Sequence, residues 1–418
     1  MTDFQLGARD SFRAVHWLIL SALTTIQFLN ILDFIVMMPL GPRFLDDMEL
    51  TTEQFGAVVA SYGYASSAAG IFAAGWIHRT PRRTTALVLV ALFACSSYLC
   101  YAAPNFWLLI VARCLTGACG GLISSIVLSI VSDVFPESRR GFAMGILMTS
   151  FSMASVVGVP MGLSLADWSS SAQSPFYYLA LACIPAWLVL FYVLPNIARP
   201  HADHSGGYWS TMIRILVQPE HAWALLFTAV LVFQTFLIVP YLATYFVRNV
   251  GLPKEHLAWI YVFGGGATFF SMPMIGRLAD RFGKPRTYVW IACLAIFPTI
   301  AIPILPPMAS WGCTAITTLY FILTSARMVP GQAMVSSVPA PELRAGFLSL
   351  SGSVQAFSTG MAASVSALIV QQSSDGKLER LWFAGVLGAM FFALSLLLVP
   401  KLKPSPSRHS DSEPGQAL

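Results

Sequence analysis

The feature that most constrains this chain is a series of twelve long apolar runs that carry almost no charge. A run of about 18 or more nearly uncharged residues is long enough to cross a bilayer as a helix. Only 10% of the 418 residues are charged, whereas soluble domains carry roughly 25%. The sequence therefore predicts an all-α membrane protein with twelve transmembrane helices. The expected spans are 15–40, 54–77, 84–102, 105–131, 141–166, 174–195, 221–247, 256–278, 287–306, 309–336, 346–371 and 380–400.

The motif content argues against chemistry within the membrane. All seven cysteines fall inside apolar runs and none forms a C-x-x-C pair, so we expect neither a zinc site nor a disulfide framework. The sequence has no Walker A loop, which argues against ATP as a ligand. It also lacks an evident pairing of a nucleophile with a base. We therefore expect a protein that is not an enzyme and that has no cofactor, no metal and no nucleic-acid partner.

The distribution of positive charge predicts the orientation of the spans. If the N-terminus is cytoplasmic, 17 of the 24 Lys and Arg residues fall in inner segments and five fall in outer loops. Cytoplasmic loops carry the excess of Lys and Arg in membrane proteins. The pattern therefore predicts that both termini are cytoplasmic. The short loops further favour a bacterial inner membrane, and nothing in the sequence argues against a monomer.

Two patterns recur at offsets near half the chain length. The pattern P-E-x-R-x-G-F occurs at residues 136–142 and again at 341–347, and R-x-x-x-G begins at Arg113 and again at Arg327. Parallel repeats of six spans form transporters that bind substrate near the midplane, between two halves. We therefore expect two pseudo-symmetric six-helix halves. The predicted divisions are an N-terminal half at 1–195, a cytoplasmic linker at 196–220 with a short interfacial helix at 208–217, a C-terminal half at 221–400 and a disordered cytoplasmic tail at 401–418.

The loop between the eighth and ninth spans carries a family resemblance. The segment GRLADRFGKPR at residues 276–286 is similar to the G-x-L-a-D-r-x-G-r-r loop of the major facilitator superfamily. In that family the loop helps to latch one conformation, so the resemblance implies a twelve-helix transporter. The equivalent loop between spans 2 and 3 has Arg79 where the family has an acidic residue, which argues against a latch there. The latch residues that the resemblance implies are Gly276, Asp280, Arg281, Gly283 and Lys284.

Three further segments resemble the same family. Residues 109–117 are similar to its fourth-span motif with an intramembrane arginine, here Arg113, and residues 33–42 resemble the end of the first span in drug and sugar exporters. Residues 154–162 resemble the fifth-span motif found mainly in exporters. There, Gly158, Pro160 and Gly162 are expected to let helices pack closely and to bend the span where the halves meet. Together these segments favour the branch of proton-coupled antiporters for drugs and sugars.

Asp33 and Arg113 are the candidates for proton coupling. An ionisable side chain within a bilayer costs at least about 2.5–3.5 kcal/mol, so such residues are functional suspects. Asp33 is the only carboxylate well inside an expected span. It could exchange a proton, bind a cationic substrate or form a structural salt bridge. Arg113 could pair with Asp33, bind an anionic substrate or bond to backbone carbonyls. Arg327, its repeat partner, could instead hold Glu342 or Asp280 near the cytoplasmic end.

A polar stripe on the first span is the best clue to a substrate site. Gln27, Asn30 and Asp33 are spaced by three and therefore lie on one helical face. Each of the other polar candidates is individually more typical of a hydrogen bond between helices. The predicted substrate-binding residues are Gln27, Asn30, Asp33, Tyr62, Gln234, Tyr241, Gln332 and Gln355.

These features favour a proton-coupled exporter of small molecules that works by alternating access. Its substrate could be a drug-like compound, a sugar or a metabolite, and its other partners would be protons and the lipid bilayer. Uptake of a nutrient by a symporter of the same fold is the alternative. A receptor would need a large extramembrane signalling domain, for which the sequence shows no candidate.

Overall fold

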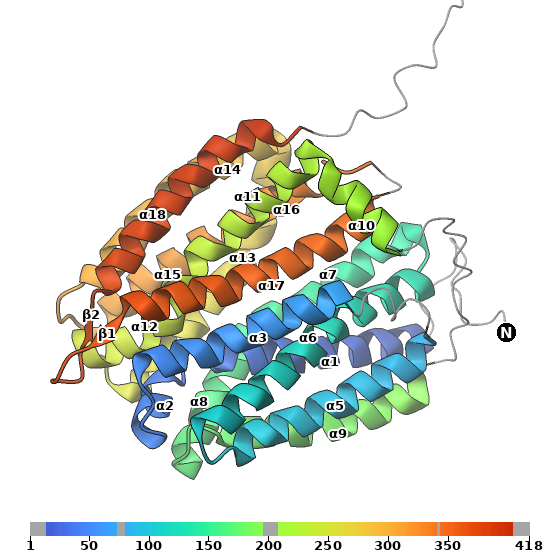
Figure 1. The fold of residues 1–418 in the computed structure, drawn as a ribbon. Helices are drawn as coiled ribbons and strands as arrows, with labels where there is room; N and C mark the ends of the chain where they lie inside the picture. The colour runs from blue at the N-terminus through green and yellow to red at the C-terminus, as the bar shows by residue number, and fades with distance from the viewer. Residues whose placement is uncertain (1–13, 73–79, 195–207, 341–342, 404–418) are drawn as a thin grey trace, which may run out of the picture.

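The structure, a computed structural model, describes residues 14–72, 80–194, 208–340 and 343–403. Its described part is almost wholly helical, and the helices cross a common slab between two ends (Figure 1). One end carries the short helix α2 (Gly41–Asp47) and a hairpin of β1 (Gln371–Gln372) and β2 (Leu378–Glu379), and we call it the hairpin end. The opposite end, where α1 (Ala14–Val36) begins and α18 (Leu381–Leu398) ends, is the termini end.

All twelve expected spans are present as helical crossings, six in each half. The first half contains α1 (Ala14–Val36), α3 (Thr52–Phe72), α5 (Arg82–Ala102), α6 (Phe106–Val134), α7 (Glu137–Met153) continued by α8 (Val159–Ser169), and α9 (Ser174–Val193). The second half contains α11 (Pro219–Phe236) continued by α12 (Val239–Tyr245), α13 (Leu257–Phe282), α14 (Lys284–Ala301), α15 (Ser310–Ala326) continued by α16 (Met328–Val335), α17 (Arg344–Ile369) and α18 (Leu381–Leu398). The helix α10 (Tyr208–Val217) coincides with the short helix predicted before the second half.

Three spans that the sequence predicts as continuous are broken in the structure, between α7 and α8, between α11 and α12, and between α15 and α16. A π-helical turn, Ala154–Gly158, separates α7 from α8, and Pro160 follows it at the start of α8. The break between α11 and α12 likewise precedes a proline, Pro240. Proline lacks an N–H group and cannot continue the hydrogen-bond ladder, so local π and turn geometry takes up the difference. Hydropathy does not report such breaks, because the apolar run continues through them.

Ten of the described helical segments are long and apolar enough to cross a membrane by composition alone, and α3 and α17 are not among them. These two helices lie side by side in the middle of the molecule, one from each half (Figure 1). Glycines bring their backbones together: a Cβ at Gly63 would lie 2.7 Å from the Ala356 carbonyl oxygen, and one at Gly56 would lie 2.4 Å from the Ala367 Cβ. Helices that pack on protein need less hydropathy than helices that face lipid, which explains their lower values.

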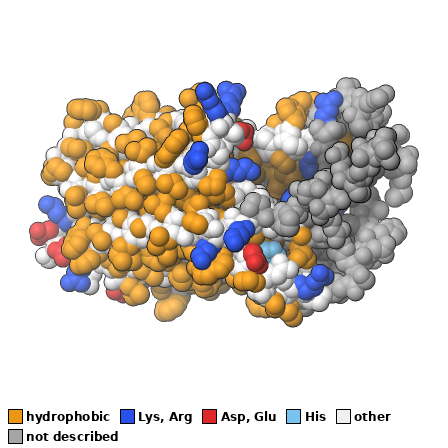
Figure 2. Space-filling view, turned by 90° about the horizontal axis from the view of Figure 1, so that it is seen from above, with side chains coloured by type: hydrophobic (Ala, Val, Ile, Leu, Met, Phe, Trp, Pro, Cys, Tyr) orange, Lys and Arg blue, Asp and Glu red, His pale blue; other side chains and the backbone are white. Residues whose placement is uncertain are grey.

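The side faces of the molecule are apolar. Figure 2 shows hydrophobic side chains covering much of the visible lateral surface, with Lys and Arg gathered toward the ends. Exposed aromatic residues such as Trp107, Trp168 and Trp311 are typical of positions where helices meet the membrane interface. This surface matches a protein whose solvent is the lipid bilayer.

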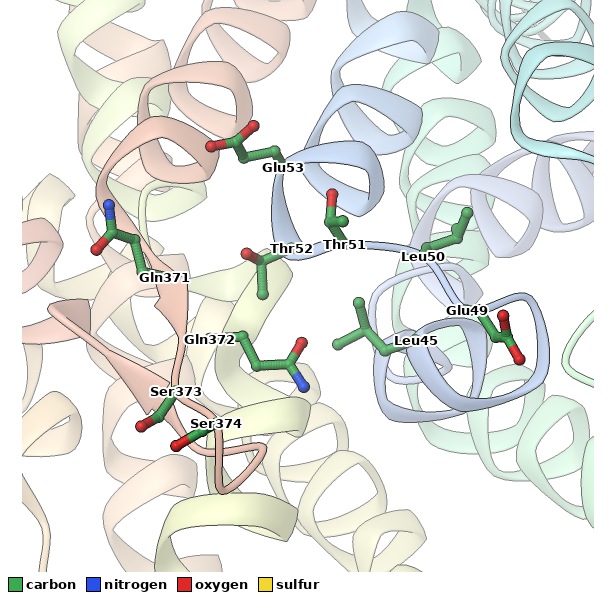
Figure 3. Close-up of a pocket in the computed structure, with 10 residues that line it drawn as sticks. All are labelled: Leu45, Glu49, Leu50, Thr51, Thr52, Glu53, Gln371, Gln372, Ser373 and Ser374. Carbon is green, nitrogen blue, oxygen red and sulfur yellow. The ribbon is translucent and has the colours of Figure 1, made fainter.

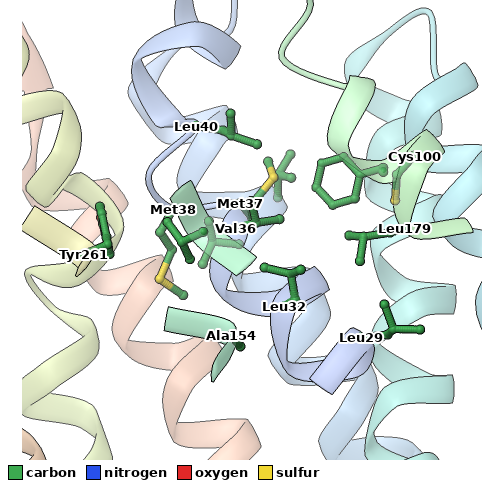
Figure 4. Packing of buried hydrophobic residues seen from close by; sticks show 14 of the residues in the cluster. Leu29, Leu32, Val36, Met37, Met38, Leu40, Cys100, Ala154, Leu179 and Tyr261 are labelled. Atoms are coloured by element: carbon green, nitrogen blue, oxygen red, sulfur yellow. The ribbon is translucent and has the colours of Figure 1, made fainter. Parts of the chain in front are cut away.

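The fifth-span glycines pack on the first span rather than on the other half. A Cβ at Gly158 would lie 2.7 Å from Leu32 Cδ1, and a Cβ at Gly162 would lie 2.5 Å from Val36 Cγ2. Figure 4 shows Leu32 and Val36 among the buried residues around this end of α1. The contact with the second half comes from the π-helical turn, where Gly265 of α13 approaches Ser155. The contact of this span with the second half thus lies at the turn, while the two glycines hold α8 against α1.

Some predicted features lie outside the described residues. These are the first-half loop at 73–79 with Arg79, the linker segment at 195–207, Glu342 and the tail from residue 404. The division of the chain into a linker and a tail therefore stays a prediction.

Candidate functional site

A buried ion pair lies inside the first half. Arg113 Nη1, on α6, is 2.7 Å from Asp33 Oδ2, on α1, and neither side chain is more than 1% exposed. Ser97 of α5 donates to the second carboxylate oxygen, Oδ1, over 3.2 Å. Three helices therefore hold one carboxylate, and its charge is neutralised by one guanidinium. Of the roles left open for Arg113, the structure shows the pairing with Asp33 and a bond to a backbone carbonyl, that of Asp33 at 3.5 Å.

Aromatic rings line the other side of the guanidinium. The Cζ atom of Arg113 lies 4.7 Å from the centre of the Tyr62 ring and 5.7 Å from that of Phe176. The Nε and Nη2 atoms of Arg113 are buried and have no hydrogen-bond partner among the described residues. Ring faces attract cations electrostatically. The surroundings of the pair thus stabilise the arginine as a cation without offering it a second carboxylate.

The polar stripe of α1 faces α6, not the second half. Tyr62 donates to Asn30 Oδ1 over 3.2 Å, and Asn30 Nδ2 donates to the Gly120 carbonyl over 3.0 Å. Ser124 of α6 accepts from both Asn30 Nδ2 and Gln27 Nε2. The predicted common face of Gln27, Asn30 and Asp33 is therefore present. It is occupied by bonds within the first half, although the Gln27 Oε1 atom is buried without a partner among the described residues.

The repeat arginine of the second half has different surroundings. Arg327, between α15 and α16, donates through Nη1 to the Leu231 carbonyl over 2.8 Å and through Nη2 to Thr235 Oγ1. Its Cζ atom lies 4.7 Å from the centre of the Phe392 ring. No acidic side chain pairs with Arg327 among the described residues. The hypothesis that it holds Asp280 is wrong, because its hydrogen bonds go to α11, and Glu342 lies outside the described residues.

The remaining predicted substrate residues do not gather at one place. Gln234 is fully buried in the second half and donates to the Leu231 carbonyl of its own helix over 3.4 Å. Tyr241 lies near the hairpin end and donates across the halves to the Thr52 carbonyl over 2.8 Å. Gln332 and Gln355 are half-buried, and their side-chain amides make no hydrogen bond to a described residue. These last two therefore keep half-buried side-chain amides with no partner in the described part of the chain.

The predicted latch is a sharp turn at the termini end. Gly283 separates α13 from α14 with a φ of 90°, a left-handed conformation that favours glycine. Arg281 lies over the ring of its neighbour Phe282, at 5.3 Å. Asp280 makes no hydrogen bond or ion pair with a described residue, and the opposing loop at 73–79 lies outside the described part. The latch roles of Gly276, Asp280, Arg281, Gly283 and Lys284 therefore remain predictions.

The halves are joined at the hairpin end by contacts that sequence reasoning missed. Asp46 of α2 lies 2.6 Å from Arg248 Nη2 and 3.1 Å from Lys254 Nζ, and both cations belong to the second half. Thr52 Oγ1 donates to the Val370 carbonyl over 3.2 Å. The charges are visible in the sequence as loop residues. Their pairing is not, because Asp46 and Arg248 are 202 residues apart.

A cavity of about 720 Å³ opens beside these contacts. It lies between the start of α3 and the β1–β2 hairpin, so that both halves line it (Figure 3). Glu49 and Glu53 from the first half and Gln371 and Gln372 from the second contribute polar groups. Figure 3 places Thr51 and Ser373 on opposite sides of this opening. At the hairpin end, the boundary between the halves is thus accessible through this cavity, although ion pairs join the halves beside it.

Comparison with known proteins connects this geometry to a family. The sequence profile of the Major Facilitator Superfamily matches residues 23–329. A chloramphenicol resistance protein from Streptomyces lividans is 22% identical over 357 residues, which are 84% of this chain and 88% of that protein.

Solved structures agree on the fold. A bacterial homolog of the human lysosomal transporter Spinster, in an inward-facing and occupied conformation, has a TM-score of 0.75 at 17% identity and covers 95% of this chain and 100% of its own. The nucleoside transporter NupG has a TM-score of 0.69 at 12% identity, with 92% of this chain and 99% of its own covered. Similarity at this identity speaks for the fold alone.

Proposed function

This chain belongs to the Major Facilitator Superfamily, and from that premise we propose that it is a proton-coupled exporter of small molecules. The family consists of membrane transporters and not of enzymes, so the transport of small molecules is its common activity. The similarity to a chloramphenicol resistance protein supports export and supports drug-like compounds as the substrate class. The proposed energy source of this export is the proton gradient.

The buried pair of Asp33 and Arg113 carries the proposal of proton coupling. Both charges are sealed from water, and the removal of one charge from a buried pair is strongly destabilising. When Asp33 takes up a proton on a carboxylate oxygen, the pair changes from neutral to a net charge of +1. The arginine then loses an anionic partner, and the forces among α1, α5 and α6 change. A transporter needs such a link between proton occupancy and helix packing.

Alternating access would use that change. We propose that protonation of Asp33 from the outside and its deprotonation to the inside bias the two halves toward opposite openings. One proton that crosses a membrane potential of 100 mV releases about 2.3 kcal/mol. That energy would drive substrate outward against a gradient. Half-buried Gln332 and Gln355, with free amides, are the predicted residues best placed to contact substrate.

The topology completes the proposal. We propose that residues 1–195 and 221–400 are the two moving halves, that 196–220 is a cytoplasmic linker and that 401–418 is a cytoplasmic tail. With both termini in the cytoplasm of a bacterial cell, the hairpin end faces outward. A monomer would suffice, since the candidate residues all come from one chain.

The test is transport in proteoliposomes with an imposed pH gradient, and labelled chloramphenicol is the first probe. We expect Asp33→Asn to reduce gradient-driven accumulation at least tenfold, because the amide cannot exchange a proton. Asp167→Asn is the matched control, since Asp167 also pairs with an arginine, Arg43, but is half exposed. An uncoupler should abolish transport by the wild type.

Two outcomes would contradict the proposal. If Asp33→Asn keeps gradient-driven transport, the assignment of Asp33 is wrong. If labelled compound moves in the same direction as the proton, the protein is a symporter, which is the alternative function. Lipophilic cations and labelled sugars extend the panel of probes in the same assay.

A further inference from the structure

A chain of three aromatic rings leads from the ion pair to the other half. Arg113 lies 4.7 Å from the centre of the Tyr62 ring, and the Tyr62 ring is 5.0 Å from that of Phe34. Phe34 is in turn 5.7 Å from Phe236, which belongs to α11 of the second half. We propose that this aromatic bridge of Tyr62, Phe34 and Phe236 transmits the protonation state of Asp33 to the second half. This proposal rests on the proposed function and assigns to these three residues the coupling between proton binding at Asp33 and the second half.

The first link responds to charge. A cation attracts an aromatic face by about 0.5–1 kcal/mol at exposed sites and by about 2 kcal/mol or more when it is desolvated. While Asp33 is ionised, its carboxylate offsets the field of the guanidinium at 2.7 Å. Once Asp33 is neutral, Arg113 acts on the rings as an uncompensated cation. Protonation therefore strengthens the attraction between Arg113 and Tyr62.

The second link is held in place by close packing. A Cβ at Gly117 would lie 2.3 Å from the Tyr62 carbonyl oxygen, and a Cβ at Gly120 would lie 2.3 Å from the Tyr62 hydroxyl. These α6 glycines let α3 approach the helix that carries Arg113. Phe34 follows Asp33 in the chain, so a shift of α1 at the carboxylate moves the Phe34 ring as well. Protonation of Asp33 would thus act on the Tyr62 ring through Arg113 and on the Phe34 ring through α1.

The third link reaches a break in the seventh span. Phe236 is the last residue of α11, and the chain turns before it resumes at Val239 as α12. Beyond the break, Tyr241 donates to the Thr52 carbonyl and Arg248 pairs with Asp46. These are contacts between the halves at the hairpin end. A displacement of Phe236 would therefore act at the break between α11 and α12, next to the segment that makes these contacts at the hairpin end.

Asp33 is the one carboxyl among the titratable groups that the structure describes around the ion pair. The groups that face it are Arg113 on α6, Tyr62 on α3, Cys100 on α5 and Cys183 on α9. Arginine, tyrosine and cysteine side chains ordinarily titrate well above the carboxyl range. Asp46, Glu49 and Glu53 at the hairpin end also carry carboxyls, so the experiment includes Asp33→Asn to isolate the contribution of Asp33.

The experiment measures the opening of the hairpin end without any substrate. Spin labels are placed at Thr51→Cys and Ser373→Cys, which line the cavity from opposite halves, in a background where the native cysteines are replaced. The distance between the labels is recorded at about pH 6 and about pH 8. In the wild-type background we expect the distance distribution to shift with pH. Asp33→Asn should remove most of that shift.

The bridge is tested by Phe236→Ala, which deletes the ring in the second half. We expect this variant to lose at least four-fifths of the shift, while Phe236→Tyr, which keeps a ring, retains it. Phe233→Ala is the matched control. Phe233 is equally aromatic, lies on the same helix and packs at 4.5 Å against Phe391 within its own half. It should leave the shift unchanged.

The outcomes separate the two proposals. A wild-type protein with no shift, or an Asp33→Asn variant with a full shift, overturns proton coupling at Asp33 and the bridge with it. A shift that depends on Asp33 but survives Phe236→Ala overturns the bridge and leaves the proposed function standing. Equal loss in Phe236→Ala and Phe233→Ala also overturns it, since the effect would then be general loosening of α11.

Discussion

The two halves repeat an arginine but not its carboxylate. In the first half Arg113 pairs with Asp33, whereas in the second half Arg327 donates to the hydroxyl of a threonine, Thr235. Each arginine also reaches a backbone carbonyl of the half's first span, at Asp33 and at Leu231, and each lies 4.7 Å from an aromatic ring. The contacts that both arginines share hold two helices together in each half. The carboxylate that pairs with Arg113 can, in addition, change its charge by taking up a proton.

This difference assigns distinct tasks to the halves. A buried cation without a carboxylate keeps its charge through the cycle, because arginine stays protonated in proteins. Its carbonyl and hydroxyl partners then hold α11 against the tenth span permanently. In the first half the same arginine has a partner that can be neutralised by a proton. Under the proposed function, the contact at Arg327 is therefore fixed, whereas the contact between Arg113 and Asp33 can be altered by a proton.

The largest expected effect comes from removal of each arginine in turn. Arg113→Met leaves the Asp33 carboxylate buried without its cation, which costs about 3–5 kcal/mol of folding free energy. Arg327→Met leaves a carbonyl and a hydroxyl without a donor, which costs about 1–3 kcal/mol. Thermal unfolding in detergent should therefore show the greater loss for Arg113→Met. That variant should also lose gradient-driven transport, and Arg327→Met should keep part of it.

The comparison fails if the order is reversed. A greater loss of stability in Arg327→Met would mean that Arg327 carries an ionic partner outside the described residues. The double variant Asp33→Leu with Arg113→Met sharpens the point. It replaces the pair by apolar side chains, and such a replacement is often neutral for stability. The double variant should therefore unfold at a higher temperature than Arg113→Met and should remain inactive in transport.

A smaller effect is expected from giving the second half its missing carboxylate. Thr235→Asp places an acidic group beside Arg327, and the charge-assisted bond that results should raise stability by about 1 kcal/mol after desolvation is subtracted. The double variant Asp33→Asn with Thr235→Asp should still lack gradient-driven transport, because the carboxylate now pairs with Arg327, which lies over the Phe392 ring, and not with Arg113, which lies over the Tyr62 ring. Recovery of transport would show that either half can couple protons.

Hydropathy and motif order predicted the architecture well because each span is a long local signal. The twelve crossings, the pairing of repeats and even the short helix at Tyr208–Val217 follow from runs within the chain. A bend at Pro160 was expected, but the π-helical turn before it and the break before Pro240 were missed, since the backbone adjusts without any change in hydropathy. The lower hydropathy of α3 and α17 carries a signal of its own, since these helices pack against each other.

The site was only partly predictable for a different reason. Asp33 and Arg113 were found because a charge inside an apolar run stands out, and their pairing was one of several possibilities. The stripe of Gln27 and Asn30 was found from its spacing. Spacing gives the common face but not its neighbour, and that neighbour proved to be α6. Tyr241, Asp46 and Arg248 act across the halves, and contacts between residues some 200 positions apart leave no local pattern.

The smallest expected effect concerns the ion pairs that cross between the halves. Here too the carboxylate, Asp46, comes from the first half, and the cations, Arg248 and Lys254, come from the second. These side chains are 15–52% exposed, and exposed pairs contribute about 0.2–1 kcal/mol each. Asp46→Asn should therefore leave thermal unfolding nearly unchanged. It should widen the distance between the halves at the hairpin end, measured with the labels at Thr51→Cys and Ser373→Cys.

Salt gives the control for this last effect. Ions at physiological strength screen exposed charges beyond about 8 Å and weaken the pairs that lie in solvent, so high salt should widen the wild-type distance and leave Asp46→Asn unchanged. Asp167→Asn breaks an ion pair of similar exposure that lies wholly within the first half, and it should not move the labels. If Asp167→Asn and Asp46→Asn widened the distance equally, the hairpin end would be responding to net charge. The division of charge between the halves would then describe the resting structure without controlling its opening.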